Sequence, residues 1–319
     1  MSNIWRDRLK ERFRQPENWK RSRFQTPDSR WLDGYKALPA NPIAHVLYVA
    51  GTSEFTEKTY ELARNFNAQS FGFWAFDRYG MGRSGRRLTN VFKQHAENFD
   101  YDVADICDFT DQKMPKDKPV FLLGHSTGGL LSTMALHERP NLFKGAVLTA
   151  PLFGIADKAL KGREKIFNYI TLPDFIAHRY IPGGTDWKLR AGRNGTTDSD
   201  YSSDSDRMKL QDYWQAKDFD LRTGSLTIGW VQAASRAITK VRDPDYLSRI
   251  NRPIYIFTAG DEDMANKVDN AATQRVADLL PRSKFRNLAG ARHEMLMEAD
   301  PIRNCVLSEA MAFMRQYAI

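Results

Sequence analysis

The sequence has few cysteines and no long apolar run. Cys107 and Cys305 are the only cysteines among 319 residues, which is too few for a disulfide framework and suits a reducing compartment. No apolar run approaches the roughly 20 residues of a membrane-spanning helix, and the first residues lack the apolar segment of a secretory signal. We therefore expect a cytoplasmic protein that does not span a membrane.

Patterns for binding metals and nucleic acids are also missing. None of the six histidines occurs in a metal-ligand spacing such as H-E-x-x-H, so we expect no metal and no cofactor. The formal net charge is +8, which is compatible with a nucleic acid, an anionic lipid surface or solubility alone. Because the basic residues are spread along the chain and accompany no nucleic-acid motif, we expect no nucleic-acid partner.

One basic segment near the N-terminus is amphipathic. Ile4, Trp5, Leu9 and Phe13 fall near one face of a helix, and arginine and lysine surround them. Such a helix can pack on its own domain with a solvated charged face, or it can lie in an anionic lipid interface. The first interpretation is favoured, and peripheral contact with the inner face of an anionic membrane stays open. The sequence does not determine the oligomeric state.

The most informative motif surrounds Ser126. The motif is Gly-His-Ser-Thr-Gly at 124–128, after the apolar run 120–123 and before the helix-forming run 130–136. A strand that leads through a sharp turn into a helix holds a serine in a strained conformation with its hydroxyl accessible, and the glycines let strand and helix approach closely. This context predicts that Ser126 is a catalytic nucleophile.

A serine nucleophile needs an acid and a histidine, which should follow it along the chain in that order. His293, which follows Gly-Ala-Arg, is the predicted base because an imidazole titrates near neutrality. Asp261, Glu262 and Asp263 come just past the end of an apolar strand. We choose Asp263 as the acid that orients His293, and Asp261 and Glu262 remain alternatives.

The oxyanion formed during attack also needs hydrogen-bond donors. One should be the backbone N–H of Thr127, directly after the nucleophile, and the other should come from the loop after an earlier strand. Residues 43–50 have the pattern of that strand, and Thr52 in the following loop is the predicted second donor. The side chain of Thr52 can also cap a helix, because Glu-Phe-Thr-Glu-Lys follows shortly after it.

Together these segments resemble the α/β-hydrolase family of bacterial lysophospholipases and monoacylglycerol lipases, and the resemblance extends from about residue 24 to residue 313. The matching pieces are Gly-Thr-Ser-Glu at 51–54, Asp-Arg-Tyr-Gly-Met-Gly-Arg-Ser-Gly at 77–85, Gly-His-Ser-Thr-Gly-Gly at 124–129, Leu-Thr-Ile-Gly-Trp at 226–230, residues 260–263, and Gly-Ala-Arg-His-Glu-Met-Leu-Met-Glu at 290–298. Ala50 stands where the family commonly has histidine, so a side chain often found beside the oxyanion loop is missing.

The resemblance implies a serine hydrolase that cleaves the carboxylic ester of a monoacyl lipid through an acyl-enzyme. It implies a lysophospholipase, with a monoacylglycerol lipase as the alternative, and the basic composition mildly favours the phospholipid. Fold and catalytic residues do not fix the leaving group. A short-chain carboxylesterase, an aminopeptidase of the same fold and a non-catalytic binding protein are therefore further alternatives.

Alternating strands and helices predict an α/β protein, with a mainly parallel central sheet and helices on both faces; with the resemblance, this is the α/β-hydrolase fold. The expected strands lie near 43–50, 71–76, 118–123, 145–149, 253–258 and 284–288. The expected helices lie near 54–67, 98–112, 128–138, 265–279 and 299–316. An N-terminal helix over 1–20 and a hairpin of 22–26 with 31–38 should precede them.

The alternation stops for about a hundred residues before the strand near 253. This predicts a core of residues 1–152 and 248–319 and an inserted, mostly helical cap of residues 153–247, with helices near 155–170, 204–216 and 225–238. Phe153 and Trp230 are the candidate substrate-binding residues, although each apolar cap residue is more simply part of the cap's own core. The polar tract 196–206 is expected to be a solvated loop, with a mobile lid edge as the alternative.

Overall fold

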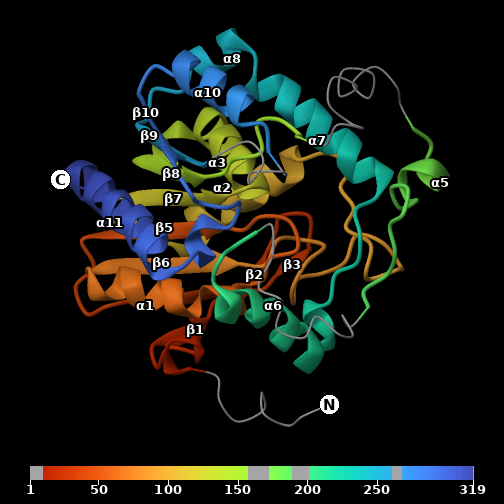
Figure 1. Cartoon of the computed structure of the whole chain (residues 1–319), viewed down its shortest axis with the longest axis horizontal. Helices are drawn as coiled ribbons and strands as arrows, with labels where there is room; N and C mark the ends of the chain where they lie inside the picture. The colour runs from red at the N-terminus through yellow and green to blue at the C-terminus, as the bar shows by residue number, and fades with distance from the viewer. Residues whose placement is uncertain (1–9, 157–171, 189–200, 261–267, 319) are drawn as a thin grey trace.

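The computed structural model describes residues 10–156, 172–188, 201–260 and 268–318. Figure 1 shows a central sheet with helices on either side of it. The described parts of the segment between residues 153 and 253 gather toward one end of the strands. The molecule therefore has the layered arrangement that the alternating pattern predicts.

Eight strands form the central sheet in the order β1-β4-β6-β5-β7-β8-β9-β10. The strands from β6 to β10 are parallel, whereas β4 pairs antiparallel with β6 and with β1. The bounds are β1 Trp19–Arg21, β4 Gly34–Ala37, β5 Ala44–Val49, β6 Phe71–Phe76, β7 Val120–His125, β8 Gly145–Thr149, β9 Ile254–Ala259 and β10 Ser283–Leu288. The strands β5 to β9 are buried along their whole length, as parallel strands covered on both faces should be. This confirms the predicted mainly parallel sheet.

Helices cover both faces of the sheet. Figure 1 shows α1 (Tyr60–Ala68) and α11 (Asp300–Tyr317) on one side, and α3 (Thr127–Glu138) and α10 (Asn270–Leu279) on the other. The helix α2 (Asp100–Lys113) packs on α3. Short 3-10 helices are η3 (Thr56–Thr59), η4 (Pro140–Leu142) and η6 (Met295–Met297). These helices agree with the predicted ones to within a few residues at each described end.

The prediction for the N-terminal region is wrong in two respects. The described part of the predicted helix over 1–20 contains only one helical turn, η2 (Glu11–Phe13), followed by the strand β1; Pro16 interrupts a helix because it has no N–H to donate. The predicted hairpin forms only over β2 (Phe24–Gln25) and β3 (Trp31–Leu32). The strand β4 instead joins the main sheet, where Tyr35 stacks on Trp19 with ring centroids 5.4 Å apart. Burial of these aromatic rings favours the extra edge strands.

The segment between β8 and β9 is mostly helical where it is described. It contains α5 (Asp174–Ala177), α6 (Ser205–Lys217), η5 (Phe219–Leu221), α7 (Ile228–Val241) and α8 (Pro244–Ser248). The helices α6 and α7 correspond to the predicted helices near 204–216 and 225–238, whereas the one predicted near 155–170 lies almost entirely outside the described residues. Within the described ranges, no helix combines the length and the apolar character that crossing a membrane requires.

The described end of the polar tract, residues 201–206, is solvated only in part: Ser203 is exposed and Ser202 is buried, and the helix α6 begins at Ser205. The hydroxyl of Ser202 donates to the carbonyl of Met297 at 2.7 Å, and Ser202 is only 1% exposed. The side chain of Asp204 accepts the N–H groups of Asp206 and Arg207 and so caps α6. Polar side chains that bond to nearby backbone can be buried at little cost, which explains why a polar sequence packs here.

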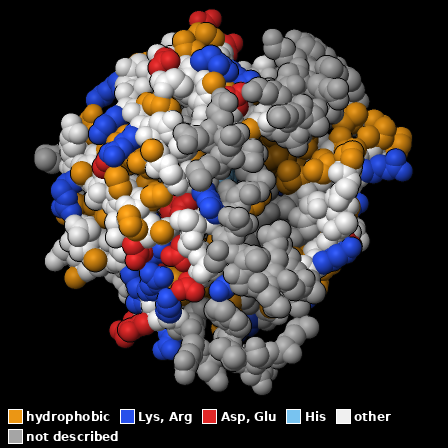
Figure 2. Space-filling model, viewed as in Figure 1, with side chains coloured by type: hydrophobic (Ala, Val, Ile, Leu, Met, Phe, Trp, Pro, Cys, Tyr) orange, Lys and Arg blue, Asp and Glu red, His pale blue; other side chains and the backbone are white. Residues whose placement is uncertain are grey.

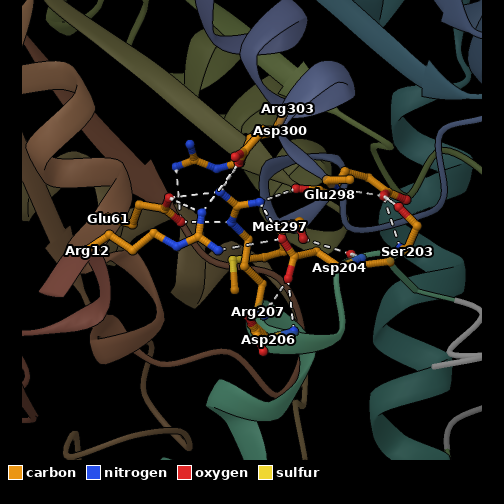
Figure 3. Close-up of polar contacts among 12 residues, drawn as sticks. Arg12, Glu61, Ser203, Asp204, Asp206, Arg207, Met297, Glu298, Asp300 and Arg303 are labelled. Carbon is orange, nitrogen blue, oxygen red and sulfur yellow. Dashed lines mark hydrogen bonds and ion pairs between the residues drawn. The ribbon is translucent and has the colours of Figure 1, made fainter. Parts of the chain in front are cut away.

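Arg207 fastens the start of α6 to the core of the protein. Its guanidinium, which is completely buried, donates to both carboxylate oxygens of Glu61 at 2.8 Å and to Asp204 at 2.8 Å. It also donates to the carbonyl of Glu298 at 2.6 Å and to Asp300 at 2.5 Å. Figure 3 shows these groups converging from α1, α6 and α11, with Arg12 and Arg303 beside them. One side chain therefore holds three elements that are far apart in the sequence.

Replacing Arg207 with methionine should lower the free energy of unfolding by about 3 kcal/mol, because it removes the hydrogen bonds of a buried guanidinium to Glu61, Asp204 and the carbonyl of Glu298. Arg12 and Arg303 still lie close to Glu61 in this variant. Urea denaturation measures this change. Arg207→Lys should restore only part of the loss, since an ammonium cannot bind a carboxylate with two parallel hydrogen bonds.

The matched control is Lys116→Met, which removes an exposed ion pair with Asp111. It should change the free energy of unfolding by less than about 1 kcal/mol. A loss for Arg207→Met no larger than that of the control would contradict the role given to Arg207.

Candidate active site

Ser126 joins β7 to α3 in a strained turn. Its φ is 52° and its ψ is −118°, a conformation that costs a residue with a side chain about 1–3 kcal/mol. Backbone hydrogen bonds hold it there: its N–H donates to the carbonyl of Thr149 at 3.0 Å, and its carbonyl accepts the N–H groups of Gly129 at 2.9 Å, Leu152 at 3.0 Å and Leu130 at 3.4 Å. The turn leaves Ser126 half-buried at the carboxyl end of β7.

The two glycines of the motif let α3 approach the sheet. A Cβ atom on Gly128 would lie 1.9 Å from the carbonyl oxygen of Val49 in β5, and one on Gly124 would lie 2.6 Å from the carbonyl oxygen of Gly128. Backbone atoms cannot tolerate contacts this short, so alanine at either position would push the helix away from the strands. The steric role predicted for these glycines agrees with the structure.

His293 faces the hydroxyl of Ser126 from the loop that follows β10. Its Nε2 atom lies 3.1 Å from Ser126 Oγ, which is a hydrogen-bond distance. The imidazole is buried, and its ring centroid is 5.0 Å from that of His125. The structure thus brings the predicted nucleophile and the predicted base together. At this distance the imidazole can take the hydroxyl proton as the oxygen attacks a carbonyl.

Glu298 closes the loop that carries His293. Its carboxylate is fully buried and accepts the N–H of Arg292 at 2.9 Å, the N–H of Ser203 at 3.0 Å and the N–H of Ala299 at 3.1 Å. The same group therefore ties the residue before His293 to the start of the α6 region. The sequence did not predict this role of Glu298, because the residues around it do not indicate which backbone N–H groups its carboxylate binds.

The predicted acid lies outside the described residues, as do its alternatives. Asp261, Glu262 and Asp263 all fall between Gly260 and the next described residue, Val268. The N–H of Gly260 donates to the carbonyl of Ala291 at 3.1 Å, so the chain enters that segment beside the histidine loop. The choice among the three carboxylates stays a prediction.

The two predicted oxyanion donors belong to residues in direct contact. Thr52 Oγ1 lies 2.7 Å from Thr127 Oγ1. Thr127 is the first residue of α3, so its N–H has no acceptor inside that helix. The capping role considered for Thr52 is not what the structure shows, since η3 begins after Phe55 without a side-chain cap. The contact between the threonines places the loop after β5 against the turn that holds Ser126.

Two buried side chains support the loop that contains Thr52. The N–H of Gly51 donates to Glu54 Oε2 at 2.6 Å, and Tyr48 Oη donates to the same oxygen at 2.8 Å. Arg78 Nη2 donates to the carbonyl of Gly51 at 3.2 Å, and its Nη1 donates to Asp102 at 3.2 Å. Burial lowers the pKa of Arg78, and the negative charge of Asp102 opposes this change. Both the N–H and the carbonyl of Gly51 are therefore held by hydrogen bonds to buried side chains.

The two candidate substrate-binding residues are buried. Trp230, on α7, has its N–H bonded to Thr227 Oγ1 and packs edge-on against Phe99 with ring centroids 5.6 Å apart. Phe153 is fully buried just after β8, where its carbonyl accepts a bond from Arg242 Nε at 2.6 Å. Both belong to the continuous apolar core, and a contact of either with substrate stays a prediction.

The described residues contain no group of three or more histidine, cysteine or acidic side chains arranged to hold a metal ion. Within these ranges the chemical groups that meet at the end of β7 are a hydroxyl, an imidazole and backbone amides. Such groups are sufficient for acyl transfer through a covalent intermediate.

Comparison with known proteins finds a matching family and several relatives. The model of a family described as serine aminopeptidase, S33, matches residues 40–300. The chain is 28% identical over 274 residues to the probable lysophospholipase L2 of Haemophilus influenzae, covering 84% of this chain and 83% of that protein. It is 35% identical over 114 residues to the monoglyceride lipase of Mus musculus, covering 35% of this chain and 36% of that one.

A solved structure shares the fold. The soluble variant of monoglyceride lipase from Saccharomyces cerevisiae, in complex with a substrate analog, superimposes with a TM-score of 0.72 at 16% identity and covers 96% of this chain and 97% of its own. The predicted family and fold are therefore confirmed: the chain belongs to the serine aminopeptidase S33 family and has the α/β-hydrolase fold.

Proposed function

We propose that the protein is a serine hydrolase that cleaves the carboxylic ester of a monoacyl lipid, with a lysophospholipid as the preferred substrate. The observation that carries this proposal is the distance of 3.1 Å between Ser126 Oγ and His293 Nε2 in a strained turn between strand and helix. The relatives named lysophospholipase and monoglyceride lipase agree with a carboxylic ester hydrolase. A monoacylglycerol lipase or a short-chain carboxylesterase is the alternative.

The proposed reaction begins when Ser126 Oγ attacks the ester carbonyl and His293 Nε2 accepts the hydroxyl proton. The C–O bond to the alcohol then breaks, and the imidazolium returns the proton to the leaving oxygen. A water molecule, activated by the same imidazole, hydrolyses the acyl-enzyme and releases the fatty acid. The acid, for which we keep Asp263, orients the imidazole and stabilises its charged form.

Two backbone amides, those of Thr52 and Thr127, are proposed to hold the oxyanion. Removing one such donor typically slows the chemical step about 100- to 1,000-fold in serine hydrolases. The contact between the two threonine hydroxyls at 2.7 Å supports the assignment, because it keeps the two loops together. The amides can then act as a preformed pair rather than being assembled by the substrate.

A polar cavity supports a charged or strongly polar leaving group. It has a volume of about 310 Å³ and is lined by Ser53, the residue after the proposed oxyanion donor Thr52, and by Trp187, Lys188 and Asp212 among others. A lysophospholipid head group carries charge, whereas the alcohol of a short-chain ester does not. We propose that residues 153–247, which supply most of this lining, form the cap over a core of residues 1–152 and 248–319.

The proposal is tested with a panel of lysophospholipids, monoglycerides, p-nitrophenyl esters and an aminoacyl amide. The protein should hydrolyse monoacyl lipids with a higher kcat/KM than short esters, and lysophospholipids with the highest value. Ser126→Ala should reduce kcat at least about 1,000-fold on every active substrate, because it removes the nucleophile.

The matched control is Ser308→Ala, which removes an exposed serine on α11 and should keep full activity. A fluorophosphonate should label the unaltered protein and the control but not Ser126→Ala. If the protein hydrolyses the aminoacyl amide and none of the esters, it is an aminopeptidase and the proposed ester hydrolase is wrong. Activity retained in Ser126→Ala, or no labelling at all, would refute the serine mechanism.

The acid is tested separately. Asp263→Asn should lower kcat about 1,000- to 10,000-fold, because an amide leaves His293 in the wrong tautomer, while Asp261→Asn and Glu262→Gln should stay near the unaltered rate. Steady-state kinetics on one p-nitrophenyl ester measures all three. An inactive Asp261→Asn beside an active Asp263→Asn would show that the acid lies two residues earlier.

We propose that contact with a lipid surface is made at α5. Of the amphipathic N-terminal stretch, Ile4, Trp5 and Leu9 lie outside the described residues, and Phe13 packs against Leu210 and Met297 of the protein itself. In contrast, Phe175 on α5 is 72% exposed, and Figure 2 shows hydrophobic side chains gathered over this region. An exposed aromatic residue beside a cation, here Arg179, suits an anionic lipid interface.

Phe175→Ser should therefore reduce binding to vesicles of anionic phospholipid up to about 10-fold, because it removes one apolar side chain from the interface. Vesicle sedimentation measures the binding. The control Leu279→Ser changes an exposed apolar residue at the end of α10 and should leave binding unchanged. Both variants should hydrolyse a water-soluble ester at the rate of the unaltered protein. If Phe175→Ser binds vesicles as well as the unaltered protein does, the proposed lipid contact at α5 is wrong.

A further inference from the structure

A buried chain of three charged side chains connects the oxyanion loop to the histidine loop. Lys58, in η3, lies with its Nζ 3.4 Å from Glu54 Oε1 and 3.1 Å from Glu294 Oε2. The three side chains are 3%, 7% and 11% exposed for Lys58, Glu54 and Glu294, respectively. Glu54 belongs to the loop of Thr52, and Glu294 directly follows His293. None of the three has a part in the chemical steps described above.

Each end of this chain acts on a backbone segment at the site. At one end, Glu54 Oε2 accepts the N–H of Gly51 at 2.6 Å, which is the residue before the proposed oxyanion donor. At the other end, Glu294 donates its own N–H to the carbonyl of Tyr201 at 2.7 Å. Lys58 also donates to Gln211 of α6 at 3.4 Å. A shift of Lys58 would thus be felt by both loops and by α6.

Glu54 and Lys58 each favour the ionised form of the other. Burial by itself would raise the pKa of Glu54, but Lys58, the nearby His125 and the Gly51 amide hold the pKa of Glu54 at about 2. Burial by itself would lower the pKa of Lys58, but Glu294 and Glu54 raise it above its ordinary value. At neutral pH Glu54 and Lys58 are therefore both ionised, and Lys58 also contacts the carboxyl group of Glu294.

A purely structural role is a weak explanation for such a group. Replacing a buried set of charges with neutral side chains of similar volume is often neutral or stabilising, so stability alone does not require it. Directional contacts, in contrast, fix the separation of the two loops that must meet around the reacting carbonyl. A misplacement of about 1 Å at such a site can cost about 100-fold in rate.

We propose that Lys58 is a positioning residue that sets the oxyanion amides relative to His293 through Glu54 and Glu294. This inference rests on the proposed serine-hydrolase function. It assigns Lys58 no contact with substrate or with Ser126. Its effect is therefore expected on kcat, while the KM for a short ester, which reports on binding of the ground state, should change little.

The test compares Lys58→Met with the unaltered protein on a water-soluble p-nitrophenyl ester. We expect kcat to fall about 10- to 100-fold with KM within about twofold. Without the cation, burial raises the pKa of Glu54, so Glu54 becomes protonated as the pH falls through a range in which it is normally ionised. The acid limb of the kcat profile should accordingly move to higher pH.

Two further variants separate positioning from stability. Arg30→Met breaks a bidentate ion pair with buried Asp105 away from the site, and it should lower the melting temperature without changing kcat or its pH profile.

The triple variant E54Q/K58M/E294Q contains no buried charge at this place, so it should fold even where Lys58→Met does not. Its kcat should still be at least about 10-fold low, because the link is broken.

A folded triple variant with unaltered kcat would overturn the proposal, as would a Lys58→Met protein with unaltered kcat and pH profile. Fluorophosphonate labelling and ester hydrolysis by the unaltered protein are measured in the same series. If these fail, the proposed function itself is wrong. If they succeed and the variants match the unaltered protein, only the role of Lys58 is wrong.

Discussion

The strained turn at Ser126 is the constraint on which the rest of the site depends. A residue with a side chain holds φ at 52° only where its surroundings leave it no alternative. Here the neighbours in β8 and α3 bind its N–H and carbonyl, and Gly128 lets the helix touch the backbone of β5. The buried parallel strands are what make this geometry rigid. Strain at the serine is thus maintained by the whole centre of the sheet.

The loops around this turn are held by buried polar groups rather than by apolar packing. Glu298 closes the histidine loop and binds Ser203, while Arg207, four residues further on, bonds to the carbonyl of Glu298. Figure 3 shows Glu298 and the beginning of α6 in one network, and Glu298 also accepts the N–H of Arg292, the residue before His293. This arrangement couples the proposed cap to the proposed base through Glu298, which accepts the N–H groups of both Ser203 and Arg292.

The sequence predicted the parts of this molecule that have a periodic or local signal. Long apolar strands, the motif at 124–128 and the pairing of Ser126 with His293 follow from spacing and from the steric needs of the turn. The edge strand β1 was missed because it is short and because Trp19 lies in a segment that also fits a helix. The strand β4 lies within the predicted strand over 31–38, but its pairing with the main sheet was not predicted. Glu298 and Arg207 were missed for another reason: a buried charge is recognisable only by its partners, which lie far away in the sequence. The polar tract near 201–206 was misjudged on the same ground.

Buried cations join distant segments at three places around this site, and the directional character of their hydrogen bonds explains their use. Arg78 joins the oxyanion loop to α2, Lys58 joins it to the histidine loop, and Arg207 joins α6 to both α1 and α11. Apolar contacts of equal area would hold these segments together, yet they would tolerate sliding by a fraction of a residue. Ion pairs with fixed hydrogen-bond geometry do not tolerate it. The proposed reaction requires a hydroxyl, an imidazole and two amides to converge on one carbonyl, so fixed loop positions increase its rate. This holds even where the charges add little to the free energy of folding.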